Sequence, residues 1–408
     1  MKETDDDEAK LSCREEEQEK QEIWSWGAGT DGQLGTGNLQ DELSPQLLKL
    51  PSLFSARPIS HLACGGAHVI ALTSEGKVLT WGRGASGQLG HGDMLNNPNP
   101  KLVNILESYC ITHVSAGWNH SGFVSDCGSV FTCGDGSFGQ LGHGDYKSYC
   151  SPIKLSYFVN NHVEQMACGM RHSLVLLKFQ QGHSGDQIYA FGSGKRGQLG
   201  ISKDKVKSVS LPEVTCGLDG INIVSIAANG DHSAALSNDG KLYTWGRGFQ
   251  GKSDAYYPEH LTTSFCSTKA TLGWNHALLL TGNGEACILG GNRHGVLSRP
   301  DKVSALENMQ DSNDLLEEVP GLDGEKVVDI AAGSEHSALI TEKGVVKTWG
   351  WGEHGQLGLG NTVDQTSPQP VTLYNEVPTE AVTSKVYCGS GFTIVIRTKD
   401  APLPPRCK

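Results

Sequence analysis

The chain has 408 residues, a formal net charge of -12, and 52 glycines but only 16 prolines. A negative balance of this size argues against a surface that binds nucleic acid or acidic lipid over its whole extent, and the low proline content excludes collagen. No apolar run approaches the ~20 residues of a membrane-spanning helix, so we expect no membrane insertion.

The chain begins with an acidic segment. Residues 1–22 hold ten acidic and four basic side chains, which give this segment a net charge of -6. Such runs stay solvated because like charges repel and little apolar surface is available for burial. We predict a disordered acidic tail over 1–22, a folded region over 23–398 and a second tail over 399–408. Docking of the acidic tail to a basic partner stays open as an alternative.

From residue 23 onward a glycine motif recurs seven times. Its first copy reads WGAGTDGQLG, and six of the seven copies keep an intact G-x-G-x-x-G. The copies begin at Trp26, Trp81, Cys133, Phe191, Trp245, Leu289 and Trp349. No single cofactor needs six dinucleotide-binding fingerprints, so we interpret the motif as a repeated turn and expect no cofactor.

A second motif, G-x-x-H, alternates with the first and recurs at intervals of 44 to 60 residues. Its copies end at His68, His120, His172, His232, His276, His336 and, with Phe in place of His, Phe392. The two motifs therefore define seven units of about fifty residues that cover 23–398, and such a period is typical of propellers and solenoids.

The fifth glycine copy, WGRGFQGKSD, also matches the G-x-x-x-x-G-K-[ST] pattern of a phosphate-binding loop. Its Lys252 and Ser253 occupy the Gln and Leu positions of GQLG in the other copies. A phosphate-binding loop needs a helix that starts at the Lys, whereas DAYYPEHL, with Pro258 inside it, follows here. The repeat therefore explains the match better than a nucleotide-hydrolysing site does.

Between the two motifs each unit reads like HVIALTSEGKVLTWG, in which two β-prone runs flank a turn with Gly. This pattern predicts a hairpin, and a loop with Pro and another β-prone run bring the count to about four strands per unit. We predict an all-β, seven-bladed β-propeller with four-stranded blades. The chain opens with a glycine motif and ends with the hairpin half CGSGFTIVIRT, so strands from both ends should share one blade and close the ring.

Several repeated residues are interpreted as structural. The aromatic residue that opens each glycine motif should pack between blades, and the repeated His should form an inter-blade hydrogen bond. Cys64, Cys133, Cys168 and Cys388 fall at equivalent points of the repeat and are interpreted as small buried hydrophobes. That usage favours a reducing compartment, and the acidic N-terminus lacks a signal peptide, so we expect a cytoplasmic or nuclear protein.

The residues between the Gly and the His vary among the units and should lie on turns at one rim of the ring. They supply the candidates for partner binding, since Trp and Arg are enriched in interface hot spots. The candidates are Trp118, Asn119, Arg171, Asp231, Trp274, Asn275 and Glu335. An alternative is that the two Trp merely cover the central channel. We find no catalytic constellation and no metal-ligand spacing. The acidic loop 298–318 is either a binding loop or a tolerated insertion.

The alternation of G-x-x-H with W-G-x-G-x-x-G-Q-L-G in seven units resembles the regulator of chromosome condensation family, which implies the seven-bladed fold. The order of the G-x-x-H variants and the segment from Trp349 to Gly355, W-G-W-x-E-H-G, are most similar to the branch of secretion-regulating guanine nucleotide exchange factors. The founding branch binds chromatin through a basic tail; here the tail is acidic, so no direct nucleic-acid binding is expected.

The plant ultraviolet-B receptor branch is the second resemblance. It carries G-W-R-H in three consecutive blades, whereas this chain has G-W-N-H at Trp118 and Trp274, with Asn119 and Asn275 in place of Arg. We expect these two Trp to lie too far apart around the ring to form one chromophore. The resemblances imply a protein-binding propeller that serves as a guanine nucleotide exchange factor or regulator for a small GTPase. A light-sensing dimer and a non-catalytic scaffold are the alternatives.

Overall fold

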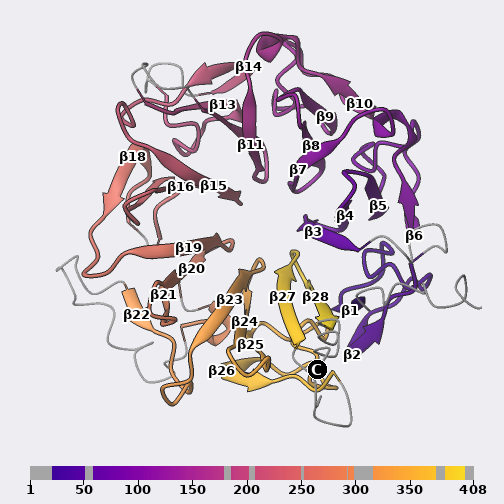
Figure 1. The fold of residues 1–408 in the computed structure, drawn as a ribbon, viewed down its shortest axis with the longest axis vertical. Coiled ribbons are helices and arrows are strands. Elements are labelled where there is room, and N and C mark those ends of the chain that lie inside the picture. The colour runs from indigo at the N-terminus through magenta and orange to yellow at the C-terminus, as the bar shows by residue number, and fades with distance from the viewer. Residues whose placement is uncertain are drawn as a thin grey trace, which may run out of the picture.

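The computed structural model describes residues 21–50, 58–178, 185–201, 207–249, 252–291, 293–297, 316–373 and 382–399. Within these ranges the strands form seven four-stranded antiparallel sheets. The sheets stand like blades around an open centre, with β3, β7, β11, β15, β19, β23 and β27 nearest the axis (Figure 1). The predicted all-β, seven-bladed propeller is confirmed.

The first three blades follow the chain. Blade 1 consists of β3 (Ile59–Cys64), β4 (His68–Thr73), β5 (Val78–Gly82) and β6 (Asn97–Leu102). Blade 2 consists of β7 (Ile111–Ala116), β8 (His120–Ser125), β9 (Val130–Gly134) and β10 (Tyr149–Lys154). Blade 3 consists of β11 (Val163–Cys168), β12 (His172–Leu177), β13 (Gln187–Ser193) and β14 (Ser208–Val214). Short 3-10 turns follow two outer strands, η2 (Asn104–Leu106) and η3 (Ser156–Phe158).

The next three blades repeat this order. Blade 4 consists of β15 (Ile223–Asn229), β16 (His232–Ser237), β17 (Leu242–Gly246) and β18 (Ala255–Leu261). Blade 5 consists of β19 (Ser267–Leu272), β20 (His276–Thr281), β21 (Ala286–Gly290) and β22 (Leu316–Glu318), with η6 (Arg293–Gly295) after β21. Blade 6 consists of β23 (Val327–Ala332), β24 (His336–Thr341), β25 (Val346–Gly350) and β26 (Gln365–Pro370).

Blade 7 closes the ring with strands from both ends of the chain. Its order is β2-β1-β28-β27, with β1 (Gln21–Gly27), β2 (Glu42–Leu47), β27 (Val382–Cys388) and β28 (Phe392–Lys399). The register of β1 on β28 runs from Gln21↔Thr398 to Gly27↔Phe392 without a break. The predicted closure is confirmed, and it gives blade 7 the same four paired strands as the other blades.

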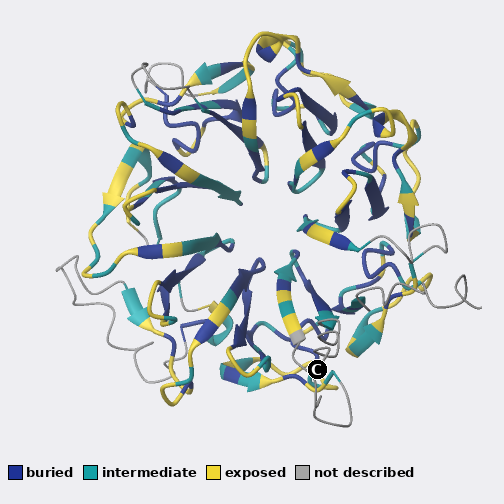
Figure 2. Cartoon of the chain, in the orientation of Figure 1, coloured by how far each residue is buried: buried dark blue, intermediate teal, exposed yellow. Residues whose placement is uncertain are grey.

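The hairpin between the second and third strands forms at the predicted glycine. Gly76 has φ +75°, a conformation that glycine adopts without a Cβ clash, and Val78 pairs with Leu72. The second strand of blades 1 to 6 is buried along its whole length, whereas the outer strands consist mostly of half-buried and exposed residues (Figure 2). The apolar cores therefore lie in the spaces between neighbouring blades, which we call seams.

Seam 6/7 shows how the repeated residues fill such a space. Trp26 and Leu357 are fully buried there. The carbonyl oxygen of Gln356 accepts hydrogen bonds from Trp26 Nε1 and Thr393 Oγ1, both at 2.9 Å. In the same seam, Thr393 Oγ1 lies 3.0 Å from His336 Nε2. The structural interpretation of the aromatic residue and of the His is confirmed.

Three predictions concern segments outside the described residues. The acidic tail 1–22 is described only from Gln21, where β1 begins, and the tail 399–408 only at Lys399. Of the acidic loop 298–318, only β22 is described. These predictions stay as they were made.

Candidate functional site

The G-x-x-H turns connect the innermost strand of each blade to the second strand, so they encircle one mouth of the central channel. Each second strand starts at the His (Phe392 in blade 7) and pairs there with the end of the third strand, as His68 does with Gly82. The glycine loops that follow the third strands therefore lie on the same face as the turns. We call this face the G-x-x-H face.

A ring of backbone hydrogen bonds fixes the turns. The first variable residue of a turn donates its N–H to the next turn, as in Gly66 N to Gly117 O and Trp118 N to Gly169 O, both at 3.1 Å. In blade 4, Asn229 stands at the Gly position, and its side chain bridges to Leu272 O and to Gly230 N, both at 2.7 Å. The variable side chains are thus presented from a rigid frame.

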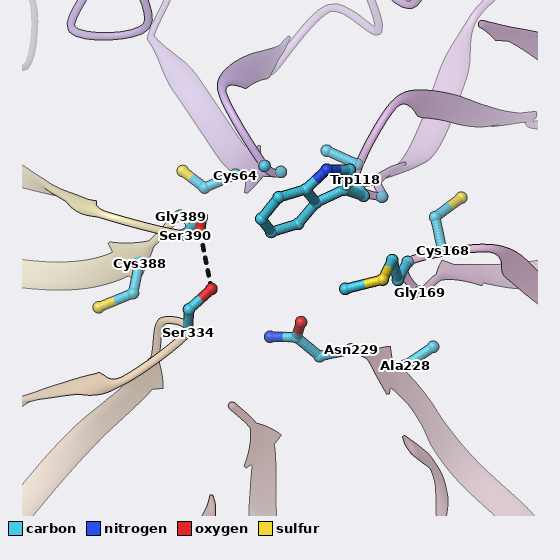
Figure 3. Close-up of a pocket in the computed structure, with 15 residues that line it drawn as sticks. Cys64, Trp118, Cys168, Gly169, Ala228, Asn229, Ser334, Cys388, Gly389 and Ser390 are labelled. Carbon is cyan, nitrogen blue, oxygen red and sulfur yellow. Dashed lines mark hydrogen bonds between the residues drawn. The ribbon is translucent and has the colours of Figure 1, made fainter. Parts of the chain in front are cut away.

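The two variable Trp meet across the channel mouth. The ring centroids of Trp118 and Trp274 lie 5.5 Å apart, with an angle of 42° between the rings. The expectation that these two Trp are too far apart is therefore wrong. They come from blades 2 and 5, but both project toward the axis, where the ring is narrowest. Figure 3 shows the Trp118 side chain extending over the centre of the mouth.

Small residues line the mouth around the two Trp. Ser334 and Ser390 are hydrogen-bonded at 2.7 Å between their hydroxyls, and the Asn229 amide points inward (Figure 3). The space that they enclose with Trp118 and Met170 is about 60 Å³. Small-molecule pockets usually measure about 300–1,000 Å³, so this mouth suits contact with a macromolecule rather than enclosure of a cofactor.

The other predicted residues are spread around the mouth. Arg171 is exposed and stacks over Phe138 at 4.8 Å from the ring centroid. Asp231 accepts a hydrogen bond from Gln198 Nε2 at 3.0 Å. Both side chains keep polar atoms at the surface, where a partner could reach them.

Glu335 and the two Asn are less accessible. Glu335 is only 5% exposed and accepts a hydrogen bond from Asn275 Nδ2 at 2.8 Å. Burial raises the pKa of its carboxyl group, a shift that the Asn275 hydrogen bond opposes. Asn119 and Asn275 are half-buried. The structure thus brings Asn275 and Glu335 together as a positioned pair rather than as two free contacts.

The six repeated His do not supply acid–base chemistry. Desolvation by burial lowers the pKa of His68, His172, His276 and His336 to about 3, and that of His120 and His232 to about 4. A general acid or base works best with a pKa near the ambient pH, so these rings stay neutral and structural. The described residues contain no group of three or more His, Cys, Asp or Glu that could hold a metal ion.

The predicted small hydrophobic Cys are packed as expected. Cys133 and Cys168 are buried in seam clusters, and Cys64 and Cys388 pack against such clusters. Burial raises the pKa of the Cys168 and Cys388 thiols to about 12. Every Cys in the described ranges is a free thiol.

Sequence reasoning missed an aromatic group on the same face. Trp351 lies between His294 and His354, with ring centroids 5.8 and 5.1 Å away. His294 Nδ1 is 2.8 Å from a carboxylate oxygen of Asp364, and His354 Nδ1 is 2.9 Å from one of Asp41. The only signal in the sequence was the second Trp of W-G-W-G-E-H-G, which departs from the repeat. That departure does not show that His294, from another blade, packs against Trp351.

The phosphate-loop match lacks its structural context. The residues after Lys252 lead into β18 (Ala255–Leu261), a strand that pairs with β17. No helix begins there to direct its N-terminus at a phosphate group. The repeat interpretation of this segment therefore fits the structure.

Comparisons with known proteins agree on one family. A model of the RCC1-like domain matches residues 22–395. The ultraviolet-B receptor UVR8 of Arabidopsis thaliana is 30% identical over 353 residues, which are 84% of this chain and 76% of the receptor. The secretion-regulating guanine nucleotide exchange factor of Bos taurus is 29% identical over 376 residues, which are 86% of this chain and 78% of the factor.

Two further similarities are to a much longer protein and to a solved structure. The human E3 ubiquitin-protein ligase HERC2 is 27% identical over 383 residues, but these are only 7% of the ligase and 94% of this chain. The crystal structure of human WBSCR16 superposes with a TM-score of 0.76 at 25% identity, covering 93% of this chain and all of that chain. In the described part of the chain, no helix has the length and apolarity needed to span a membrane.

Proposed function

This chain belongs to the RCC1-like domain family, and from that premise we propose that it binds a protein partner through the G-x-x-H face and acts as a guanine nucleotide exchange factor or regulator for a small GTPase. The observation that carries this proposal is the Trp118–Trp274 pair at the channel mouth, with Arg171 and Asp231 beside it. Aromatic and Arg side chains on a rigid frame are typical anchors of protein interfaces.

Nucleotide exchange fits a site without acid–base groups. An exchange factor binds the nucleotide-free GTPase more tightly than the loaded one and so shifts the population toward release. Every tenfold difference between the two affinities corresponds to about 1.4 kcal/mol. No bond is made or broken in the protein, so neutral buried His and a mouth of only about 60 Å³ are no obstacle.

Similarity to a secretion-regulating guanine nucleotide exchange factor supports the choice of partner class. The proposal places the protein in the cytoplasm or the nucleus, where small GTPases act. The free thiols of the described Cys suit a reducing compartment of this kind.

The test uses a panel of small GTPases loaded with a fluorescent GDP analogue. We expect the full chain to speed release from at least one of them, and Trp118→Ala with Trp274→Ala to reduce that effect at least about tenfold, as loss of a hot spot does. Lys343→Ala, in the β24–β25 hairpin away from the G-x-x-H face, is the matched control and should release nucleotide like the parent. Unchanged release across the panel would overturn the exchange function, and a scaffold role would then account for any bound protein.

A second candidate function is light sensing, because the Trp pair favours it. Rings 5.5 Å apart are close enough to share excitation, and the chain is similar to an ultraviolet-B receptor. If the protein is such a sensor, ultraviolet-B illumination should change its elution volume in size-exclusion chromatography, and Trp118→Phe should remove the change. An elution volume that illumination leaves unchanged excludes this candidate.

A further inference from the structure

Seam 4/5 lacks the Gln, Leu and aromatic residues that fill seam 6/7, although it keeps the repeated His as His232. Lys252 and Ser253 replace the Gln and Leu of GQLG on the blade 4 side, and Leu289 replaces the aromatic residue on the blade 5 side. Ala277 stands where neighbouring blades place Ser or Thr, so His232 Nε2 bonds instead to the carbonyl oxygen of Trp274 at 2.9 Å. Three shortened side chains, Ser253, Leu289 and Ala277, therefore belong to one seam.

The result is a cavity of about 550 Å³ that opens to solvent. One wall is apolar and consists of Phe249, Leu261, Leu289 and Leu316. Phe249 is held in place by stacking on His232, with the ring centroids 4.3 Å apart and the planes at 3°. The volume falls within the usual range of small-molecule sites, about 300–1,000 Å³.

Two cations line the same cavity. Arg247 and Lys252 contribute to its surface, and the ion pairs of the described residues include neither. The charge of Arg247 also acts on Glu335, where it lowers the pKa of the carboxyl group against the effect of burial. Arg247 is anchored by its backbone N–H, which donates to Asp231 O at 2.9 Å. The one carboxylate in the lining, that of Glu259, belongs to an exposed residue of β18 on the outer edge of the blade.

We propose that this cavity binds a small amphipathic anion, with its apolar body against the Leu and Phe wall and its negative group on Arg247 and Lys252. Charged hydrogen bonds to a carboxylate, sulfonate or phosphate are about twice as strong as neutral ones. Anion binding would therefore account for two cations that the packing of the seam does not require. The site requires no nucleotide and no phosphate-binding helix, and it is independent of exchange at the Trp pair.

The probes are 8-anilinonaphthalene-1-sulfonate, whose fluorescence rises in apolar sites, and the pair decanoate and decanol. We expect saturable binding of the sulfonate at one site per chain. Decanoate should displace it at least about tenfold better than decanol, since only decanoate forms the charged hydrogen bonds.

Variants locate the site. Lys252→Gln with Ser253→Leu restores the Gln and Leu of the repeat. It should refill the blade 4 side of the seam and abolish binding of the sulfonate. Lys252→Gln alone should weaken the preference for decanoate while leaving decanol unchanged, since only Arg247 then remains to bind the carboxylate. Lys101→Gln, at an exposed lysine of β6, is the charge-matched control and should bind like the parent. Binding that persists in the refilled variant, absence of saturable binding, or equal displacement by decanoate and decanol would overturn the proposal.

Discussion

Seam 6/7 and seam 4/5 occupy equivalent places in the ring and share the repeated His, but they differ at the Gln, Leu and aromatic positions. In seam 6/7 one carbonyl oxygen, that of Gln356, receives two hydrogen bonds, and Trp26 is fully buried. In seam 4/5 the equivalents are Lys252 and Leu289, and a cavity of about 550 Å³ remains. The comparison shows that one seam can lose its repeated residues while the blades on either side keep their four strands, as expected when each repeat contacts mainly its neighbours.

Lowering the pH should have the largest effect on stability, because it acts at once on the repeated His of six seams, seam 4/5 included. The pKa of the repeated His is about 3 to 4 in the fold and 6.5 in an ordinary environment. Between pH 6.5 and about 4 the unfolded chain therefore binds more protons than the folded chain. The contribution of each neutral His to the free energy of unfolding is fully present above pH 6.5. As the pH drops below 6.5, the free energy of unfolding decreases by up to about 1.4 kcal/mol per pH unit for each ring. Urea denaturation at pH 7.5, 6 and 5 measures this slope, and a flat profile would contradict the buried neutral rings.

Removing the aromatic residue from the complete seam should have the next largest effect. Trp26→Ala leaves a cavity and removes one of the two hydrogen bonds that the Gln356 carbonyl oxygen accepts, and large-to-small changes of this kind cost about 3–5 kcal/mol. Leu289→Ala is the matched change in seam 4/5 and should cost less, about 2 kcal/mol, since its surroundings are already loosely packed. Urea denaturation compares the two, and equal losses would mean that the cavity does not weaken its seam.

The hydrogen-bond chain of seam 6/7 can be dissected with a shape-conserving change. Thr393→Val leaves His336 Nε2 without its partner at 3.0 Å, and an unsatisfied buried polar group costs about 1–3 kcal/mol. The double variant His336→Phe with Thr393→Val reproduces the natural pair of seam 7/1, where Phe392 faces Val69, and should recover most of the loss. It should also reduce the dependence of the free energy of unfolding on pH, since one of the six buried His has been removed. A double variant no better than the single one would contradict the pairing.

Filling the cavity should have the smallest effect. Leu289→Trp restores an aromatic residue to seam 4/5, and cavity-filling changes typically add about 0.5–2 kcal/mol. Thermal denaturation should show a higher Tm. A lower Tm would contradict this expectation and would indicate that the cavity cannot accept an indole ring without strain.

The repeat pattern predicted the blades, the closure and the structural His, because these depend on positions that recur in every unit. It failed for Trp118 and Trp274, since spacing along the chain says nothing about how far a side chain reaches toward the axis. The substitutions at Lys252 and Leu289 are visible in the sequence, but they belong to different units, and only the structure shows that they line the same cavity. Residues that depart from the repeat thus need coordinates for their interpretation.

The pairing of β1 with β28 has a consequence for biosynthesis. The ribosome releases Gln21–Gly27 before the other six blades, but the strand that this segment must join, Phe392–Lys399, emerges only after all six have been synthesised. Until then blade 7 is incomplete, and the nascent chain exposes unpaired strand edges that are prone to aggregation and that chaperones must shield. Premature stop codons before residue 392 should therefore yield products that are degraded rather than partly active.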